Sequence, residues 1–218
     1  VPVLGLVEKG WVIASVDYRL SGEARFPAQI HDIKAAIRFL RAKSDAYGLR
    51  TDNVIIIGSS AGGHLAALAG VTNGDKYLEG SVGGFRNESS DIQGIISLYG
   101  ASNLTTILTQ STPHGLSVRV PALDLFIGGQ PDVLVEETRL ASPVFHVDAN
   151  DPPLLMIHGD QDPQMPINQS HELEGKYESV GASVIFVALH GAKHGGSMFY
   201  DTERMDRMNR FLTKIIGS

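Results

Sequence analysis

Five short apolar runs recur along the chain, and polar residues follow each of them. The runs are nearly continuous and rich in Val and Ile, which is typical of strands that are buried on both faces of a parallel sheet. The pattern therefore predicts strands at residues 11–16, 54–57, 92–98, 154–157 and 184–189.

Apolar residues at helical spacing occupy the segments between these runs. Ile30, Ile33, Ile37 and Leu40 form one stripe, and apolar residues between positions 205 and 215 form another. Strands that alternate with helices predict an α/β fold, in which helices cover both faces of a mostly parallel sheet. The 218 residues contain no internal repeat or linker, so we expect a single domain over residues 1–218.

Two stretches depart from this alternation. Residues 73–90 are rich in Gly, Ser and charged residues and are expected to form a surface loop. At about residues 101–140, short helical pieces broken by Pro113, Pro121 and Pro131 predict a cap or insertion at one edge of the sheet. A cap over a cleft would suit a ligand with an apolar part. A helix pair that simply packs on the body of the protein is an equal alternative.

Composition limits the partners and the chemistry. The chain has 18 Lys and Arg against 24 Asp and Glu, a net charge of -6, and no run of basic residues. Neither nucleic acid nor an anionic membrane is therefore an expected partner. The lack of cysteine excludes disulfides, thiolate metal sites and a cysteine nucleophile. The opening segment, which holds Glu8 and Lys9, matches neither a signal peptide nor a membrane span. We expect a soluble protein, cytoplasmic or secreted.

A candidate nucleophile follows the second predicted strand. Residues 58–62 (GSSAG) match the pattern G-x-S-x-G and precede the helix-forming stretch HLAALA. A serine on a tight strand-to-helix turn projects its hydroxyl from the sheet. Gly58 and Gly62 are both expected to be required, because side chains there would strike neighbouring backbone. The start of the next helix favours the negative charge that develops in acyl transfer. This placement makes Ser60 the candidate nucleophile.

A base and a carboxylate follow later strands in the order that this serine turn requires. A serine hydroxyl needs a base to take its proton, and the base needs a carboxylate to orient it. Asp162 follows the strand LLMIHG, and His194 follows the strand VIFVAL. Because the carboxyl ends of parallel strands meet at one edge of the sheet, we expect these two side chains to lie beside Ser60.

Each of these residues has a rival. Asp160 lies in the same loop as Asp162, but its place directly after a glycine suits closure of the turn. His190 sits at a strand end, whereas a glycine-flanked loop gives His194 the reach to fold back over the site. The two other histidines near these motifs are interpreted as hydrogen-bonded packing residues: His64 and His158.

A metal site and glycosylation are two alternative interpretations of local motifs. The four-residue spacing of His190 and His194 resembles zinc hydrolases, but their glycine neighbours predict a loop rather than the helix that such a site needs. No metal or other cofactor is therefore expected. The three N-x-S/T sequences are interpreted as chance matches: Asn87, Asn103 and Asn168.

Four segments resemble the α/β-hydrolase superfamily: VDYRLS, GSSAGGHLAA, SPVFHVDANDPPLLMIHGDQDPQMP and HGAKHGG. Within it, they are similar to hormone-sensitive-lipase-like and carbohydrate-active esterases, including acetyl and feruloyl esterases. The resemblance covers nearly the whole chain. It implies an α/β-hydrolase fold, with Ser60 as nucleophile, Asp162 as acid and His194 as base.

The resemblance also implies roles for residues near the triad. The backbone N–H of Ala61 would be one oxyanion donor, and Arg19 would form a structural ion pair. Ser59 flanks the nucleophile and Tyr99 lies where such esterases line the pocket, so both are expected to contact substrate.

The sequence departs from the family pattern at its N-terminal end. Such esterases carry an H-G-G-G loop before the strand that ends in DYRL, so here the first strands and the second oxyanion donor are absent. In the family's strand order, one strand lies between those that end at Asp17 and Ser60, and a gap there would leave two rows of backbone hydrogen bonds unmade. We rank three explanations: an upstream piece, a shift of the strand that ends at Asp17, and a homodimer formed by strand swapping.

The expected function is that of a serine carboxylesterase acting on small acyl or aryl esters, with acetyl or feruloyl esters of plant carbohydrates as one class. The expected partner is a small-molecule ester. Two alternatives remain open: a serine peptidase or amidase with the same triad, and a non-catalytic binding protein if the oxyanion loop is truly missing.

Overall fold

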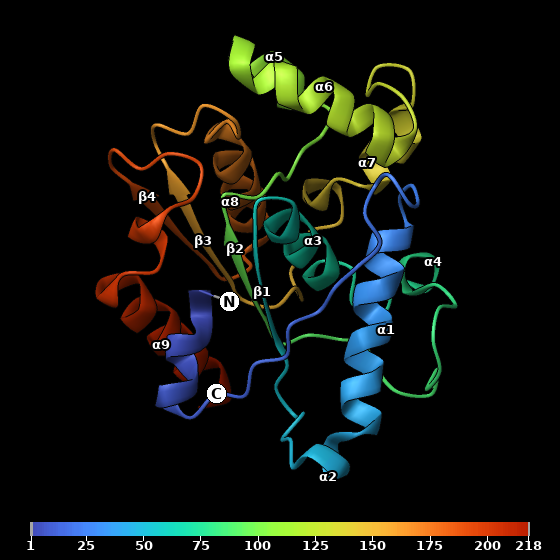
Figure 1. The fold of residues 1–218 in the computed structure, drawn as a ribbon, viewed down its shortest axis with the longest axis vertical. Helices are drawn as coiled ribbons and strands as arrows, with labels where there is room; N and C mark the ends of the chain where they lie inside the picture. The colour runs from blue at the N-terminus through green and yellow to red at the C-terminus, as the bar shows by residue number, and fades with distance from the viewer. Residues whose placement is uncertain (1, 218) are drawn as a thin grey trace.

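Four parallel strands form a single sheet in the computed structural model, which describes residues 2–217 (Figure 1). In spatial order they are β1 (Ile55–Ser59), β2 (Gly94–Leu98), β3 (Leu154–Gly159) and β4 (Val184–Leu189). One row of paired residues crosses the sheet near the carboxyl ends of the strands: Ser59, Leu98, Ile157 and Val187. Four of the five predicted strands are thus confirmed.

The prediction of a strand at residues 11–16 is wrong. After η1 (Pro2–Lys9), a 3-10 helix, residues 11–20 have no regular secondary structure. Trp11 and Ile13 pack against a core cluster, whereas the side chain of Val12 is 73% exposed. A cavity of about 770 Å³ is lined both by this segment and by β1. The segment does not pair with β1. An apolar run without a neighbouring strand cannot form the inter-strand hydrogen bonds of a sheet.

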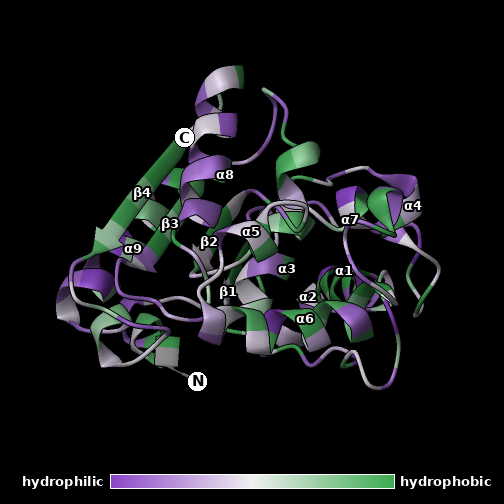
Figure 2. Ribbon diagram, turned by 90° about the horizontal axis from the view of Figure 1, so that it is seen from above, coloured by the Kyte–Doolittle hydropathy of each residue, from purple (hydrophilic) through white to green (hydrophobic). Residues whose placement is uncertain are grey.

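Helices cover both faces of the sheet, as predicted. On one face lie α1 (Ala28–Ala42), α3 (Ala61–Gly70) and α8 (Asn168–Val180), and on the other lie α9 (Thr202–Ile216) and η1. Successive residues of a strand enter opposite cores, since Ile95 packs in the first and Ile96 in the second. Figure 2 shows β3 and β4 coloured mostly as hydrophobic. This two-sided burial explains the continuous apolar runs of the sequence.

Residues 101–140 form helices that lie across the carboxyl ends of the strands (Figure 1). They are α5 (Ile107–Gln110), α6 (Pro113–Ile127) and α7 (Val135–Leu140), and they enclose a small core of their own. Pro113 occupies the first turn of α6, but the predicted break at Pro121 is absent because this residue lies inside the helix. Pro121 is on the exposed side, where water can satisfy the carbonyl that its ring leaves free.

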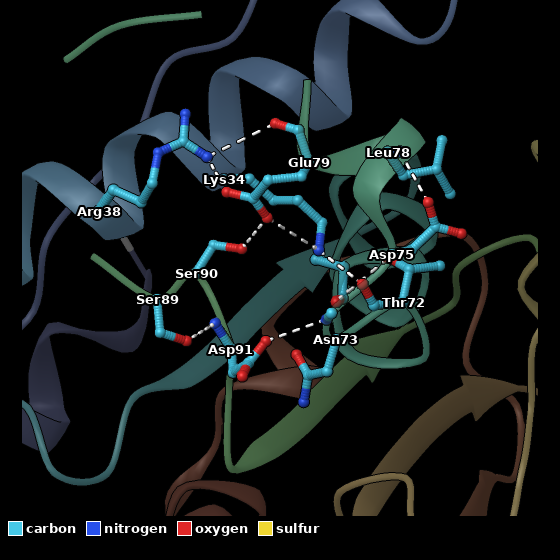
Figure 3. Close-up of polar contacts among 12 residues, drawn as sticks. Lys34, Arg38, Thr72, Asn73, Asp75, Leu78, Glu79, Ser89, Ser90 and Asp91 are labelled. Atoms are coloured by element: carbon cyan, nitrogen blue, oxygen red, sulfur yellow. Dashed lines mark hydrogen bonds and ion pairs between the residues drawn. The ribbon is translucent and has the colours of Figure 1, made fainter. Parts of the chain in front are cut away.

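Residues 73–90 dock on α1 through a buried ionic cluster, which the sequence did not predict (Figure 3). The cluster joins Lys34 and Arg38 of α1, which are 0% and 1% exposed, to Glu79 at the end of the short helix α4 (Lys76–Glu79). Arg38 donates to the Glu79 carboxylate, as does Ser90. Lys34 Nζ lies 3.8 Å from the same carboxylate and donates to Thr72 O at 2.7 Å. Two buried cations therefore share one carboxylate.

The remaining elements are single turns that connect the larger ones. They are α2 (Ser44–Tyr47), η2 (Pro143–Phe145) and η3 (Ser197–Phe199).

Candidate active site

Ser60 occupies a sharp turn between β1 and α3. Its φ of +54° lies in the left-handed region, which a residue with a side chain adopts only under strain. Two backbone hydrogen bonds hold this turn: Ser60 N donates to Leu98 O at 2.9 Å, and His64 N donates to Ser60 O at 3.0 Å. The neighbouring strand and the following helix thus maintain a conformation that presents the serine hydroxyl.

The glycines around this turn differ in their roles. A Cβ on Gly58 would lie 2.0 Å from Gly62 O, and one on Gly63 would lie 2.8 Å from Leu98 O. A Cβ on Gly62 would meet nothing within 4 Å. The prediction that Gly58 must be a glycine is confirmed, but the same prediction for Gly62 is wrong. Gly63, one residue later, makes the close approach to the neighbouring strand.

The structure brings Ser60, His194 and Asp162 together from three different loops. Ser60 Oγ lies 2.8 Å from His194 Nε2, and His194 Nδ1 lies 2.7 Å from Asp162 Oδ2. A carboxylate only accepts hydrogen bonds, so Nδ1 carries the proton and Nε2 is free to accept from the serine hydroxyl. The Asp162 side chain is fully buried, whereas that of His194 is 13% exposed. This geometry can transfer a proton from the serine to the imidazole.

Asp162 is held as an anion by four donors. Its Oδ1 accepts from Gln164 N at 2.8 Å and from Met165 N at 2.9 Å, and its Oδ2 faces His194 and His158. Burial acts to raise the pKa of Asp162. The hydrogen bonds from the two histidines and from the two backbone N–H groups outweigh burial and hold the pKa well below its usual range.

Asp160 and His190 form a separate pair away from this chain of hydrogen bonds. His190 Nδ1 lies 2.8 Å from Asp160 Oδ2, and the His190 side chain is 96% exposed. Gly191 N donates to Asp160 Oδ1 at 2.8 Å. Asp160 thus closes its turn through backbone N–H bonding, as predicted, and His190 does not reach Ser60. Within residues 2–217, no group of three or more His, Asp or Glu side chains is placed to hold a metal ion.

Ala61 and His64 lie on α3. Ala61 is the first residue of this helix, where backbone N–H groups have no acceptor within the helix. His64 is buried, and Ala101 O lies 3.2 Å from its Nδ1. Burial lowers the pKa of His64 to about 4, so the ring is neutral near pH 7. This fits the interpretation of His64 as a packing residue.

Tyr99 and Ser59, the predicted substrate contacts, both lie beside the triad. Tyr99 is buried and its ring packs edge-on against the His194 ring, with centroids 4.9 Å apart, and against Phe199. Tyr200 connects Tyr99 and Ser59. Its hydroxyl lies 3.5 Å from Tyr99 Oη and is hydrogen bonded to Ser59. Burial is the main cause that raises the pKa of Tyr200 to about 12, and the neighbouring Tyr99 also raises it. Contact of Tyr99 and Ser59 with substrate stays a prediction.

Arg19 forms the ion pair that the resemblance implied. Its Nε and Nη2 donate to the two carboxylate oxygens of Asp32 at 2.9 and 2.8 Å. The Arg19 N–H also donates to Asp32. The pair fastens the extended segment before α1 to that helix.

Protein-family models match residues 2–177 of the chain to the family described as BD-FAE. The chain belongs to the BD-FAE family. Among solved structures, this BD-FAE chain is similar to a truncated carbohydrate esterase from gut microbiota, with a TM-score of 0.86 and 33% identity over 94% of this chain and 74% of that one. It is also similar to a bifunctional GH43-CE protein of Bacteroides eggerthii, with a TM-score of 0.88 and 35% identity over 97% of this chain and 28% of that one. The predicted α/β-hydrolase fold is confirmed.

The BD-FAE chain is also 33% identical to Esterase LipC of Mycobacterium tuberculosis, over 87% of this chain and 46% of LipC. It spans about half the length of the curated relatives that it matches. In the described part of the chain, no helix is long and apolar enough to cross a membrane.

Three residues near the BD-FAE site were not predicted to act there: His158, Ser170 and Arg119. His158 lies against Asp162, and Ser170 of α8 lies against His158. Arg119 of α6 is partly buried beside Gln164 O and interacts with the Asp162 charge. The position of His158 at a strand end, four residues before Asp162, was the available signal in the sequence. No local pattern marks the other two.

Proposed function

We propose that this BD-FAE chain is a serine carboxylesterase that acts through Ser60, His194 and Asp162. The observation that carries the proposal is the continuous chain of hydrogen bonds from Ser60 Oγ through His194 to Asp162, with distances of 2.8 and 2.7 Å. The names of the relatives, which include esterases and carbohydrate esterases, support the same reaction class.

In the proposed reaction, Ser60 Oγ attacks the ester carbonyl while His194 Nε2 takes the hydroxyl proton. The tetrahedral intermediate collapses when His194 returns this proton to the departing alcohol, which leaves an acyl group on Ser60. Water then attacks the acyl-enzyme, with His194 again acting as base, and releases the acid. Asp162 stays ionised and stabilises the imidazolium that forms in each step.

Ala61 N–H is proposed as one donor to the oxyanion. It lies at the N-terminal end of α3, where the aligned peptide dipoles also favour negative charge. Removal of one such donor typically lowers the rate by about 10² to 10³. The source of a second donor is therefore decisive for the rate, although it does not alter the proposed order of steps.

The proposed substrate is a small acyl or aryl ester, with acetyl or feruloyl esters of carbohydrates as the favoured class. Two observations support this choice. Helices α5 and α6 lie over the carboxyl ends of the strands, after which the triad residues follow (Figure 1). A similar solved structure is described as a carbohydrate esterase.

Replacement of the nucleophile tests the reaction. Ser60→Ala is expected to abolish hydrolysis of p-nitrophenyl acetate, whereas Ser179→Ala, which removes an exposed hydroxyl on α8, should retain it. Labelling by a fluorophosphonate probe, read by intact mass, should add one group to the wild type and none to Ser60→Ala. Ester hydrolysis that survives in Ser60→Ala would contradict the proposed function. A panel of acetyl, butyryl and feruloyl esters then tests the substrate class.

A further inference from the structure

His158 is a fully buried histidine that the proposed reaction does not use. It lies in β3, and its two ring nitrogens contact three groups. Nδ1 lies 2.8 Å from Ser170 Oγ, and Nε2 lies 3.0 Å from Met165 O and 3.4 Å from Asp162 Oδ2. A packing histidine would not need to face the catalytic carboxylate, so these contacts point to a further role.

The partners of His158 determine where its proton lies. A backbone carbonyl and an ionised carboxylate only accept hydrogen bonds, so Nε2 must carry the proton that faces Met165 O and Asp162. Ser170 can donate, and its hydroxyl then points to the lone pair of Nδ1. The neutral imidazole with its proton on Nε2 satisfies all of these contacts.

His158 shares one carboxylate oxygen with the proposed base. Asp162 Oδ2 faces His194 Nδ1 at 2.7 Å and His158 Nε2 at 3.4 Å. His194 sits in a loop, whereas His158 belongs to a strand paired on both sides. The strand therefore provides a rigid N–H that limits how the carboxylate moves and reduces the charge that it directs at His194.

We propose that His158 is a positioning residue, whose Nε2–H fixes Asp162 and moderates its attraction for the His194 proton, while the Ser170 hydroxyl supports the required tautomer. This inference rests on the proposed function. It extends the chain of polar contacts to Ser170, His158, Asp162, His194 and Ser60, which come from α8, β3 and three loops.

The inference predicts a direction for the pH dependence. Without the His158 N–H, the negative charge of Asp162 is shared with fewer donors and binds the His194 proton more strongly. The acid limb of kcat/KM, which reports the protonation of His194, should then move to higher pH. The other groups around this pair are Arg119 of α6 beside Asp162, Tyr99 after β2 against the His194 ring, and the exposed Lys193. None of these changes in the variants below.

The test compares two replacements of His158. His158→Met has a similar volume and no donor, whereas the amide nitrogen of His158→Gln can occupy the position of Nε2. We expect His158→Met to move the acid limb upward by about 0.5 pH unit and to lower kcat about fivefold at unchanged KM. His158→Gln should stay within about twofold of the wild type in kcat and keep its acid limb. His171→Met, at a half-exposed histidine of α8, is the matched control and should change neither.

A purely structural role gives a different result. Both His158 variants would then lose thermal stability, and the acid limb of each would stay in place. An acid limb of His158→Met that is unmoved, or that moves to lower pH, overturns the inference. It does so without affecting the proposed function, provided that activity still depends on Ser60.

A second measurement needs no folded His158→Met. In the wild type with 15N-labelled imidazoles, NMR at the pH of the kinetic assay should show His158 with its proton on Nε2 and a bare Nδ1. The His158→Gln spectrum identifies this signal by its loss. A proton on Nδ1 of His158 would overturn the inference even if His158→Met could not be purified.

Discussion

The ring of Tyr99 packs edge-on against the ring of His194, with centroids 4.9 Å apart. Tyr99 follows β2 directly and has a φ of +40°, a conformation that costs a bulky residue about 1 to 3 kcal/mol. The same ring also packs against Phe199. The strained backbone of Tyr99 therefore holds an aromatic ring against the His194 imidazole, which accepts the hydrogen bond from Ser60.

This contact predicts that the ring of Tyr99 matters more than its hydroxyl. Tyr99→Leu is expected to lower kcat for p-nitrophenyl acetate about tenfold, since an aromatic pair of this kind contributes about 0.5 to 1.5 kcal/mol. Tyr99→Phe keeps the ring and should stay within about twofold. Steady-state kinetics separates the two possible roles: a large rise in KM for Tyr99→Phe would instead indicate that the hydroxyl binds substrate.

The lowered pKa of Asp162 predicts a pH-dependent contribution to stability. The group is more acidic in the folded protein than its usual value of about 3.9, so it stabilises the fold above that pH and loses this contribution as the pH falls through the folded pKa. Urea unfolding of the wild type and Asp162→Asn should show a large difference in free energy at pH 7 and a smaller one at pH 3. An unchanged difference would contradict a lowered pKa. In activity assays, the same variant should lose about 10⁴-fold in kcat.

The buried ionic cluster of Figure 3 predicts a large loss of stability when the Glu79 carboxylate is removed. Glu79→Gln removes the one carboxylate that Lys34 and Arg38 share. We expect it to destabilise the protein by about 2 to 4 kcal/mol, near the lower end of the cost of breaking a buried ion pair, because Glu79 is partly exposed. Glu88→Gln, an exposed residue of the same segment, is the control and should change the free energy of unfolding by less than about 0.5 kcal/mol.

Addition of Lys34→Met to Glu79→Gln removes one uncompensated cation and should recover part of the lost stability. Equal urea midpoints for Glu79→Gln and the wild type would show that the cluster contributes nothing.

The glycines near Ser60 predict opposite effects of the same small substitution. Gly58→Ala places a methyl group 2.0 Å from Gly62 O and is expected to destabilise the fold by about 3 kcal/mol or to prevent folding. Gly62→Ala meets open space in the first turn of α3 and should leave stability unchanged or raise it by up to about 1 kcal/mol. Thermal melting of the two variants provides the comparison, and similar losses in both would disprove this account of the turn.

The strands and the candidate triad could be predicted because each depends on a local pattern at a known place in an α/β sheet. Four apolar runs became strands, and Ser60, Asp162 and His194 follow three of them. The run at residues 11–16 has the same pattern but no neighbouring strand in the described structure. Pairing depends on residues that are distant in sequence, so the run alone could not reveal this.

The buried ion pairs could not be predicted for a different reason. Lys34 and Arg38 lie on α1 among Ile30, Ile33 and Ile37, so their positions on the apolar stripe were visible. A helix stripe does not reveal, however, that Glu79 would arrive from a loop to neutralise them. His158 is similar, because only the fold shows that its Nε2 faces Asp162 rather than a hydrophobic neighbour.

The row of paired residues that crosses the sheet is a common reference level for the three loops that carry the triad residues. Ser60 comes one residue after this row on β1, Asp162 five after it on β3, and His194 seven after it on β4. Neighbouring strands lie about 4.8 Å apart, so each strand farther from β1 needs a longer reach to return to the serine. The number of residues in these loops, more than the identity of their exposed side chains, therefore decides whether the three groups meet. A one-residue deletion between β4 and His194 would separate them, whereas many substitutions at the same positions would not.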